Sequence, residues 1–295
     1  MHTQLDCIPC LLRQALEAIR RLTDDEEAHV RLMRDLVRHL GDLDMTRPPP
    51  VMGQHLHRLI RRLLGDDDPY RAIKEQFNRH ALMLFPSLKR RIDESDDPFD
   101  TALRLAIAGN TIDFAALSDV TESKVHDVIE RALSRPLIGT AGGLQRRIES
   151  AGDILYLADN AGEIVFDRLL IERLPRDRVT LAVRGRPVIN DATLEDAEVA
   201  GLTSLAEVID NGSDAPGTIL EDCSPEFRRR FDEADLILAK GMGNFETLSS
   251  VDGRSIYFLL MAKCPLIAQH IGCAEGDFVV VSPGRARLER QGSVT

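Results

Sequence analysis

Residues 154–163, Ile-Leu-Tyr-Leu-Ala-Asp-Asn-Ala-Gly-Glu, decide the predicted fold. An uninterrupted apolar run, Ile154–Ala158, is followed at once by two acids, an amide and a glycine. A continuous apolar run is typical of a strand that is buried on both faces of a parallel sheet. The polar residues after it then lie at the carboxyl end of the strand, where open parallel sheets bind their ligands. The stretch therefore predicts a buried strand that ends in a polar turn.

Further short apolar runs follow this one, and helical segments fit between them. The runs are Val179–Val183, Leu205–Ile209, Leu236–Ala239, Leu266–Ile267 and Phe278–Val281, and helices are expected at Glu163–Arg173 and Pro225–Glu233. Strands that alternate with helices in this way predict a doubly wound α/β domain. We assign this domain to residues 149–295.

Residues 1–148 differ, because their apolar residues repeat at helical spacing almost throughout. Apolar stripes begin at Leu11, Val30 and Leu56, and Pro48–Pro50 separates the second stripe from the third. Pro86 is expected to interrupt the next helix, because proline lacks the backbone N–H that a helix interior needs. The sequence thus predicts an all-helical N-terminal domain ahead of the α/β domain.

The composition excludes several classes of function. The chain of 295 residues has a formal charge of −11, no tryptophan and 4% aromatic residues, which disfavours binding to nucleic acid or to an anionic membrane surface. No apolar run reaches the length of a membrane span. The first ten residues lack the basic start and apolar core of a secretory signal. The five cysteines then favour a reducing, cytoplasmic location.

Polar loops follow four of the predicted strands. They are Asp159–Glu163, Arg184–Thr193, Asp210–Gly217 and Lys240–Glu246. Each loop alone is compatible with an ordinary turn, because Asn, Asp and Gly favour turns, and Asp191 could simply cap the next helix. Four such loops at the ends of neighbouring strands favour a binding crevice instead.

The chemistry of these loops indicates phosphoryl transfer. Asp159, Asn160 and Asp191 offer only hard oxygen ligands, which suit Mg²⁺ or Mn²⁺. Gly162 begins a helix whose N-terminal N–H groups could face an anion. Lys240 adds a compact positive charge, and Gly241 allows close approach of backbone to a ligand. Metal, lysine and glycine loops together are the equipment with which phosphoryl transfer is catalysed.

Two further constellations lie in the helical half. Cys7-Ile8-Pro9-Cys10 places two thiols at a spacing that could hold a second metal ion, act as a redox pair or simply be buried. Asn110 and Asp113 are polar residues in an apolar stretch. They could reach the crevice, or they could mark a helix cap.

Taken in order along the chain, these motifs resemble the damage-control phosphatases of the DUF89 or ARMT1-like group. The similarity is closest to its prokaryotic branch, which carries an N-terminal Cys-x-x-Cys. The matching elements are Cys7–Cys10, Gly109-Asn110-x-x-Asp113, Asp159–Glu163, Arg184–Thr193, Asp210-Asn211-Gly212 and Lys240–Glu246. No nucleophile elbow, Walker loop or dinucleotide-binding glycine motif competes with this interpretation.

The resemblance implies a helical N-terminal region packed on a Rossmann-like α/β domain. It implies a divalent ion (Mn²⁺, Co²⁺, Ni²⁺ or Mg²⁺) held by Asp159, Asn160 and Asp191. It also implies hydrolysis of phosphate esters of small metabolites, including damaged or surplus ones. Lys240 matches the motif lysine that is expected near the substrate phosphate.

We therefore expect a metal-dependent phosphatase in which Asp159 and Lys240 are catalytic. The expected substrate-binding residues are Gly162, Arg184, Gly241, Asn244, Glu246, Asn110 and Asp113. An aspartyl-phosphate route through Asp159 stays open at this stage. The alternatives are an S-adenosylmethionine-dependent carboxyl methyltransferase, an activity once described for some members of the group, and a non-catalytic protein that binds a phosphometabolite or a metal.

Overall fold

The computed structural model describes residues 1–42, 44–110 and 122–282. The strands are β1 (Leu137–Ile138), β2 (Ile154–Leu157), β3 (Val179–Val183), β4 (Glu207–Asp210), β5 (Leu236–Lys240), β6 (Ile256–Met261) and β7 (Phe278–Val281). The helices are α1 (Cys7–Leu22), α2 (Glu26–Leu40), α3 (Pro49–Leu64), α4 (Arg71–Asp93), α5 (Pro98–Gly109), α6 (Glu122–Ser134), α7 (Ala141–Ser150), α8 (Glu163–Ile171), α9 (Leu194–Val199), α10 (Pro225–Glu233), α11 (Gly241–Leu248) and α12 (Pro265–Ile271).

The strands form one sheet of seven strands in the order β1-β7-β6-β5-β2-β3-β4. All neighbouring pairs are parallel except β6 and β7. From β2 the chain continues to β3 on one side, whereas β5, on the other side of β2, is added later. The strand order therefore reverses between β2 and β5, which is where doubly wound sheets form their ligand crevice.

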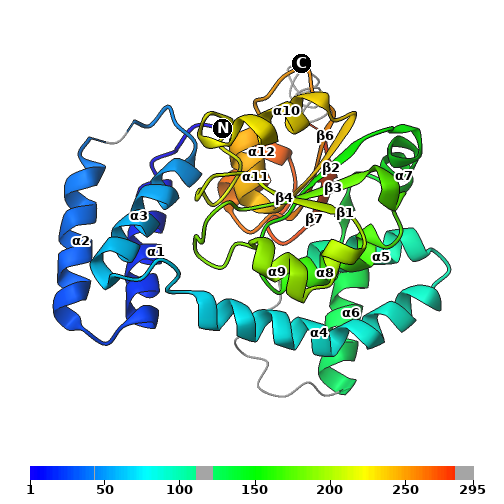
Figure 1. Ribbon diagram of the computed structural model, residues 1–295, viewed down its shortest axis with the longest axis horizontal. Coiled ribbons are helices and arrows are strands. Elements are labelled where there is room, and N and C mark those ends of the chain that lie inside the picture. The colour runs from blue at the N-terminus through cyan, green and yellow to red at the C-terminus, as the bar shows by residue number, and fades with distance from the viewer. Residues whose placement is uncertain (43, 111–121, 283–295) are drawn as a thin grey trace.

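Helices cover both faces of the sheet, as Figure 1 shows. Helices α4, α5, α8 and α9 lie on one face, and α10, α11 and α12 lie on the other. Strand β2 is buried at every position because it is covered from both sides. The expected Rossmann-like, mostly parallel sheet flanked by helices is confirmed.

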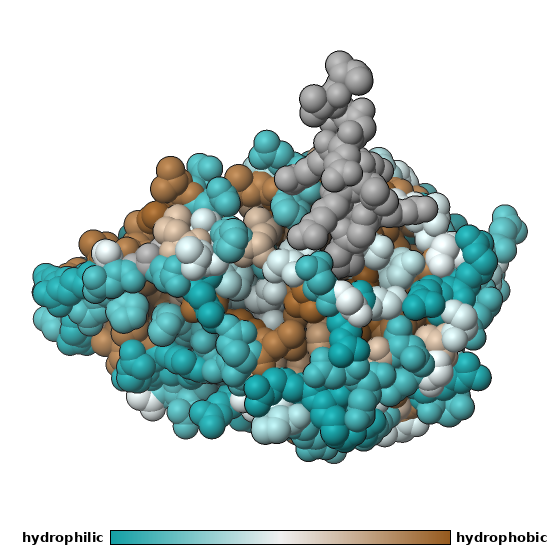
Figure 2. Space-filling view, turned by 90° about the horizontal axis from the view of Figure 1, so that it is seen from above, coloured by the Kyte–Doolittle hydropathy of each residue, from teal (hydrophilic) through white to brown (hydrophobic). Residues whose placement is uncertain are grey.

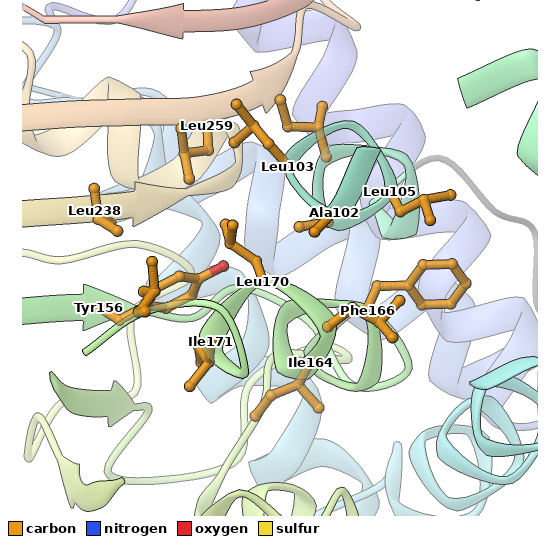
Figure 3. Packing of buried hydrophobic residues seen from close by; sticks show 14 of the residues in the cluster. Ala102, Leu103, Leu105, Tyr156, Ile164, Phe166, Leu170, Ile171, Leu238 and Leu259 are labelled. Atoms are coloured by element: carbon orange, nitrogen blue, oxygen red, sulfur yellow. The ribbon is translucent and has the colours of Figure 1, made fainter. Parts of the chain in front are cut away.

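Helices α5 and α8 pack tightly together on the first of these faces (Figure 3). Leu103 and Phe166 are completely buried, and a Cβ at Gly109 would lie only 2.8 Å from the Cβ of Phe166. Each such large apolar side chain contributes roughly 1.5–3 kcal/mol when it is fully buried. This contact fixes the C-terminal end of α5 beside the N-terminal half of α8.

Helices α1 to α3 form a separate bundle with its own apolar core, at the left of Figure 1. The bundle is joined to the sheet through the buried carboxylate of Asp214, in the loop after β4. Gln54 donates a hydrogen bond of 2.7 Å to Asp214, and Arg58 donates bonds of 2.6–3.1 Å. These charge-assisted contacts place α3 beside the carboxyl ends of the strands.

The remaining helices before residue 148 do not belong to that bundle. Apolar residues of α4, α5 and α7 share one core with the sheet, and β1 pairs with β7. The region expected to be all-helical therefore contains one two-residue strand. Part of it serves as a covering layer of the α/β unit.

Two details of the predicted secondary structure were wrong. Leu266 and Ile267 belong to helix α12, which begins with Pro265. The strand of this region is β6, which precedes that helix at Ile256–Met261. Pro86 lies inside α4 without ending it. Leu84 and Leu88 on either side of the proline are fully buried, and this packing outweighs the lost backbone hydrogen bond.

The surface is largely polar. Figure 2 shows that hydrophilic residues predominate on one face, whereas hydrophobic residues gather on the end formed by α1–α3. In the described part of the chain, no helix combines the length and the apolarity that crossing a membrane requires.

Candidate active site

The turns that follow β2 and β3 meet at the reversal of strand order. Ala192 donates a backbone hydrogen bond of 2.8 Å to the carbonyl of Asp159, and Ala161 donates one of 2.8 Å to Asn190. Asn160 and Asp191 face each other in an isolated antiparallel bridge. Two segments that are thirty residues apart in the chain are thus bonded backbone to backbone, so the structure brings Asp159, Asn160 and Asp191 together.

Arg184 links the carboxylates of the two turns. Its Nε donates to Asp191 at 2.6 Å, and its Nη2 lies 3.6 Å from Oδ1 of Asp159. The side chain of Arg184 is only 2% exposed, and no described residue accepts a hydrogen bond from its Nη2. A buried donor without a partner is costly and is therefore an observation that points to a missing acceptor.

Two amide side chains hold the carboxylates of Asp159 and Glu163. Asn110, the residue that follows α5, donates to Oδ2 of Asp159 at 2.7 Å and also contacts Glu163. Asn160 donates to the same Asp159 oxygen at 2.7 Å and to Glu163 at 2.9 Å. Helix α5 thereby contributes to a site that is otherwise built from strand ends. Asp113 lies outside the described residues.

Lys240 lies beneath this layer and is completely buried. Its Nζ donates to Glu163 at 2.7 Å and to the carbonyl of Ala106 at 2.9 Å, and it also binds Asp167. Burial alone would lower the pKa of Lys240, but the carboxylates of Asp167 and Glu163 outweigh burial and raise it. All three hydrogens of the ammonium thus have internal acceptors. The structure places Lys240 under the carboxylates and not at the open side of the site.

The site holds more carboxylate charge than its cations balance. Burial, followed by the neighbouring Glu163 and Asp191, raises the pKa of Asp159 to about 8, although Arg184 and Asn110 act in the opposite direction. Burial also raises the pKa of Asp191. Carboxyl groups that resist ionisation in this way are stabilised by an added cation.

The sequence of the chain matches the family model of the damage-control phosphatase ARMT1-like domain over residues 3–279. It is 38% identical over 279 residues to a damage-control phosphatase of Archaeoglobus fulgidus, covering 92% of this chain and 96% of the relative. It is 34% identical over 284 residues to a damage-control phosphatase of Pyrococcus horikoshii, covering 95% and 97%. The chain belongs to the ARMT1-like family.

A solved structure supports the same relationship. The crystal structure of a DUF89 family protein from Pyrococcus horikoshii superimposes with a TM-score of 0.89 at 33% identity, covering 96% of this ARMT1-like chain and 99% of the other. The resemblance that the sequence motifs indicated is therefore confirmed for the whole length of the fold.

Gly241 and Gly162 of this ARMT1-like site have different structural roles. Gly241 has φ +75°, and a Cβ there would lie 2.0 Å from Oδ2 of Asp159. Only glycine leaves room for that carboxylate. Gly162 has φ +76°, and its N–H donates to Oδ1 of Asn78 at 2.7 Å. The N–H that was expected to face an anion is thus bonded within the protein.

Asn244 and Glu246 of α11 occupy different environments. Asn244 is fully buried; it donates to the carbonyl of Lys240 at 2.7 Å and accepts from Thr218 at 2.8 Å. It fixes the turn between β5 and α11. Glu246 lies near the amino group of Met1 and near Cys7, and burial raises its pKa to about 7. The structure associates Glu246 with the start of the chain.

Cys7 and Cys10 lie in the first turn of α1 and are partly buried. Burial raises the pKa of Cys7, and the nearby Glu246, Cys264 and Cys10 act in the same direction. A raised pKa disfavours the thiolate that metals and redox chemistry require. Among the described residues, no three His, Cys, Asp or Glu side chains converge as a ready metal site, here or elsewhere.

The donor set around Asp159 fits a hard divalent cation nevertheless. It consists of two carboxylates and one amide, and hard cations take both kinds of oxygen and complete their shell with water. The excess of carboxylate charge and the raised pKa of Asp159 point the same way.

Three charged residues of the site were not predicted as site residues, although Glu163 lies in the loop Asp159–Glu163. Glu163 and Asp167 are four residues apart, one turn of α8, and both contact Lys240. Their spacing was a usable signal. Lys263 comes two residues after β6, and its Nζ donates to the carbonyl of Asn110. It was missed because no strand was assigned to residues 256–261.

Lys263 adds a cation close to the open side of the site. Unlike Lys240, Lys263 is exposed as a whole residue, but its ammonium end is bonded to the carbonyl of Asn110 beside the carboxylates. Burial of its ammonium lowers the pKa of Lys263, whereas the nearby carboxylates of Glu163 and Asp159 act to raise it. Because the side-chain amide of Asn110 donates to both of those carboxylates and its backbone carbonyl accepts from the Lys263 ammonium, these four residues form one connected group.

Proposed function

We propose that this protein is a metal-dependent phosphatase that hydrolyses phosphate esters of small metabolites. The proposal is carried by the junction of Asp159, Asn160 and Asp191 at the reversal of strand order, beside the unpartnered Nη2 of Arg184. The names of the two archaeal relatives, both damage-control phosphatases, support it.

Asp159, Asn160 and Asp191 would hold the divalent ion. When bound, such an ion supplies Lewis-acid stabilisation of phosphoryl charge and acidifies water. The hard oxygen ligands favour Mg²⁺ or Mn²⁺, and the family resemblance adds Co²⁺ and Ni²⁺. The specific ion and the requirement for it are part of the proposal.

The cations of the chain have two roles in this proposal. Arg184 aims an unused N–H at the site, and Lys263 lies at its rim, so both are placed to neutralise the oxygens of a phosphate. Lys240 orients Glu163 from below and compensates two buried carboxylates. Asn110 fixes Asp159 so that its other oxygen, Oδ1, stays on the side of Arg184.

Phosphatase assays after chelation test the proposal. Purified protein is stripped with EDTA, and hydrolysis of p-nitrophenyl phosphate is followed while Mn²⁺, Mg²⁺, Co²⁺ or Ni²⁺ is added back singly. Asp159→Ala is expected to lose roughly 10²-fold or more in rate. Asp177→Asn, an exposed acid before β3, serves as the matched control and is expected to keep full activity. Activity that survives complete chelation would contradict the proposal.

A carboxyl methyltransferase is less well supported. It would need a free acid to bind the ribose of S-adenosylmethionine, and Asp191 is ion-paired with Arg184 at 2.6 Å and is buried. Methyl transfer without added metal would favour that alternative. Tight binding of phosphometabolites without turnover in any metal would favour a non-catalytic protein.

A further inference from the structure

We infer that Asn78 of α4 is a positioning residue that supports the junction of the two turns carrying Asp159 and Asp191, and thereby the affinity for the divalent ion. The inference rests on the proposed function, because it concerns the metal of that site. Asn78 is only 2% exposed and touches neither of the two acids by a hydrogen bond of its own.

The side chain of Asn78 bonds both turns at once. Its Oδ1 accepts from the N–H of Gly162 at 2.7 Å, three residues after Asp159. Its Nδ2 donates to Oδ1 of Asp196 at 2.7 Å, five residues after Asp191. A single planar amide therefore spans the two segments, and it supports from the side of α4 the backbone hydrogen bonds by which the two turns meet.

Asp196 carries the connection back toward Asp191. Its Oδ2 accepts from the N–H and from the hydroxyl of Thr193, both at 2.8 Å, so that the start of α9 is closed by a capping box. Lys74, one turn before Asn78 on α4, forms an ion pair of 2.8 Å with the same carboxylate. Helix α4 thus holds the turn after β3 through two side chains.

Burial of this group needs an explanation beyond stability. Lys74 and Asp196 are 3% and 4% exposed, and apolar residues of similar volume often stabilise such a place equally well. Apolar contacts are not directional, however, whereas the hydrogen bonds of Lys74, Asn78 and Asp196 specify one geometry. Directional bonds matter here because the proposed ligands Asp159, Asn160 and Asp191 belong to the two turns that Asn78 and Asp196 hold.

The same two helices provide a natural contrast. Arg71 of α4 and Glu195 of α9 form an ion pair of 3.1 Å, with both side chains more than half exposed. This pair joins α4 to α9 but reaches neither Gly162 nor Thr193. Exposed pairs contribute little, so its removal should leave the turns where they are.

Metal binding to the EDTA-stripped protein tests the inference without any assay of activity. Free Mn²⁺ is measured by electron paramagnetic resonance during titration of the wild type, of Asn78→Ala and of Arg71→Ala. Asn78→Ala is expected to raise the Kd for Mn²⁺ by about 10–100-fold, the usual effect of losing a residue that supports metal ligands. Arg71→Ala is expected to bind Mn²⁺ like the wild type.

A charge-conserving exchange provides the rescue. Asn78→Asp alone sets two carboxylates against each other, and Asp196→Asn alone leaves the buried ammonium of Lys74 without its partner. The double variant restores one carboxylate and one amide in reversed order, and it is expected to recover most of the Mn²⁺ affinity. Should Asn78→Ala fail to fold, Thr193→Val removes the hydroxyl that donates to Asp196 and accepts from the Asp196 N–H and from Lys74, and a weakening of a few-fold is expected.

The outcomes separate this inference from the proposed function. A wild-type protein that binds neither Mn²⁺ nor, in calorimetric titrations, Mg²⁺, Co²⁺ or Ni²⁺ refutes both. Wild-type binding together with unchanged Kd in Asn78→Ala, whatever the loss in thermal stability measured in EDTA, refutes the positioning role and leaves the proposed function standing. Weakened binding in Asn78→Ala with recovery in the double exchange supports it.

Discussion

Replacement of Lys240 by methionine tests how the buried charges of the site are balanced. Lys240→Met keeps most of the side-chain volume but removes the ammonium that contacts Glu163 and Asp167. Removing one partner of a buried pair typically costs 3–5 kcal/mol, because the remaining charge stays buried without compensation. At pH 8 we therefore expect the free energy of unfolding to fall by about that amount.

The pH dependence of this loss is the decisive part of the prediction. Burial raises the pKa of Asp167 to about 6 even with Lys240 in place. A carboxyl whose pKa is higher in the folded state binds more protons there than in the unfolded chain, so its contribution to stability falls as the pH rises through about 6. Without the ammonium this pKa rises further. The variant should therefore recover stability on acidification, by at most about 1.4 kcal/mol per pH unit for one carboxyl.

Urea denaturation at pH 5 and at pH 8 measures the effect. The matched control is Lys89→Met, because Lys89 also pairs with a glutamate, Glu172, but is 43% exposed. Glu172 is 5% exposed but keeps Arg168 as a second partner at 3.0 Å, so Lys89→Met should lose less stability than Lys240→Met and should show little difference between pH 5 and pH 8. If Lys240→Met were destabilised equally at pH 5 and at pH 8, the assignment of uncompensated carboxylate charge would be wrong.

Three further outcomes are expected. Gly241→Ala, whose Cβ would lie 2.0 Å from Asp159, should lower phosphatase activity at least 10-fold in kinetic assays with Mn²⁺. The control is Gly253→Ala, which has the same backbone strain of a positive φ but no described atom within 4 Å of the new Cβ, and it should keep its activity. Lys263→Met should raise KM for p-nitrophenyl phosphate about 10-fold with an unchanged Tm, as loss of one exposed charge-assisted contact predicts. Removal of divalent ions should lower the Tm of the wild type, and EDTA scans without a shift would contradict a bound ion.

Much of the fold could be predicted from the apolar pattern. Strands β2, β3, β5 and β7 are short and almost wholly apolar, so burial on both faces left a clear signal. Strand β6 has the same pattern, yet it was not assigned, because the apolar pair Leu266–Ile267 was taken for the strand of that region. Those two residues form the buried face of a short helix, which so brief a run cannot reveal.

The site was predicted in part for a related reason. Polar residues that directly follow a strand can be found from the sequence, as Asp159 and Lys240 were. The direction in which Lys240 points could not, because it depends on Glu163 and Asp167 presenting acceptors beneath the sheet edge. Asn78 left no signal at all, since one asparagine in a long helix gains its meaning only from the turn that packs against it.

The positions of Lys240 and Arg184 explain why Asp159 is the acid that lacks a close cationic partner among the described residues. Lys240, fully buried, compensates Glu163 and Asp167, and Arg184 compensates Asp191 at 2.6 Å. Among the described residues, the side chains within hydrogen-bond distance of the Asp159 carboxylate are neutral amides, while the Arg184 guanidinium lies 3.6 Å away. A lysine or arginine in contact with Asp159 would satisfy its charge permanently and would compete with any bound ion. Because the fold supplies amides there, Asp159 carries the carboxylate that the proposed divalent cation would neutralise. Burial, with Glu163 and Asp191 beside it, raises the pKa of Asp159 to about 8.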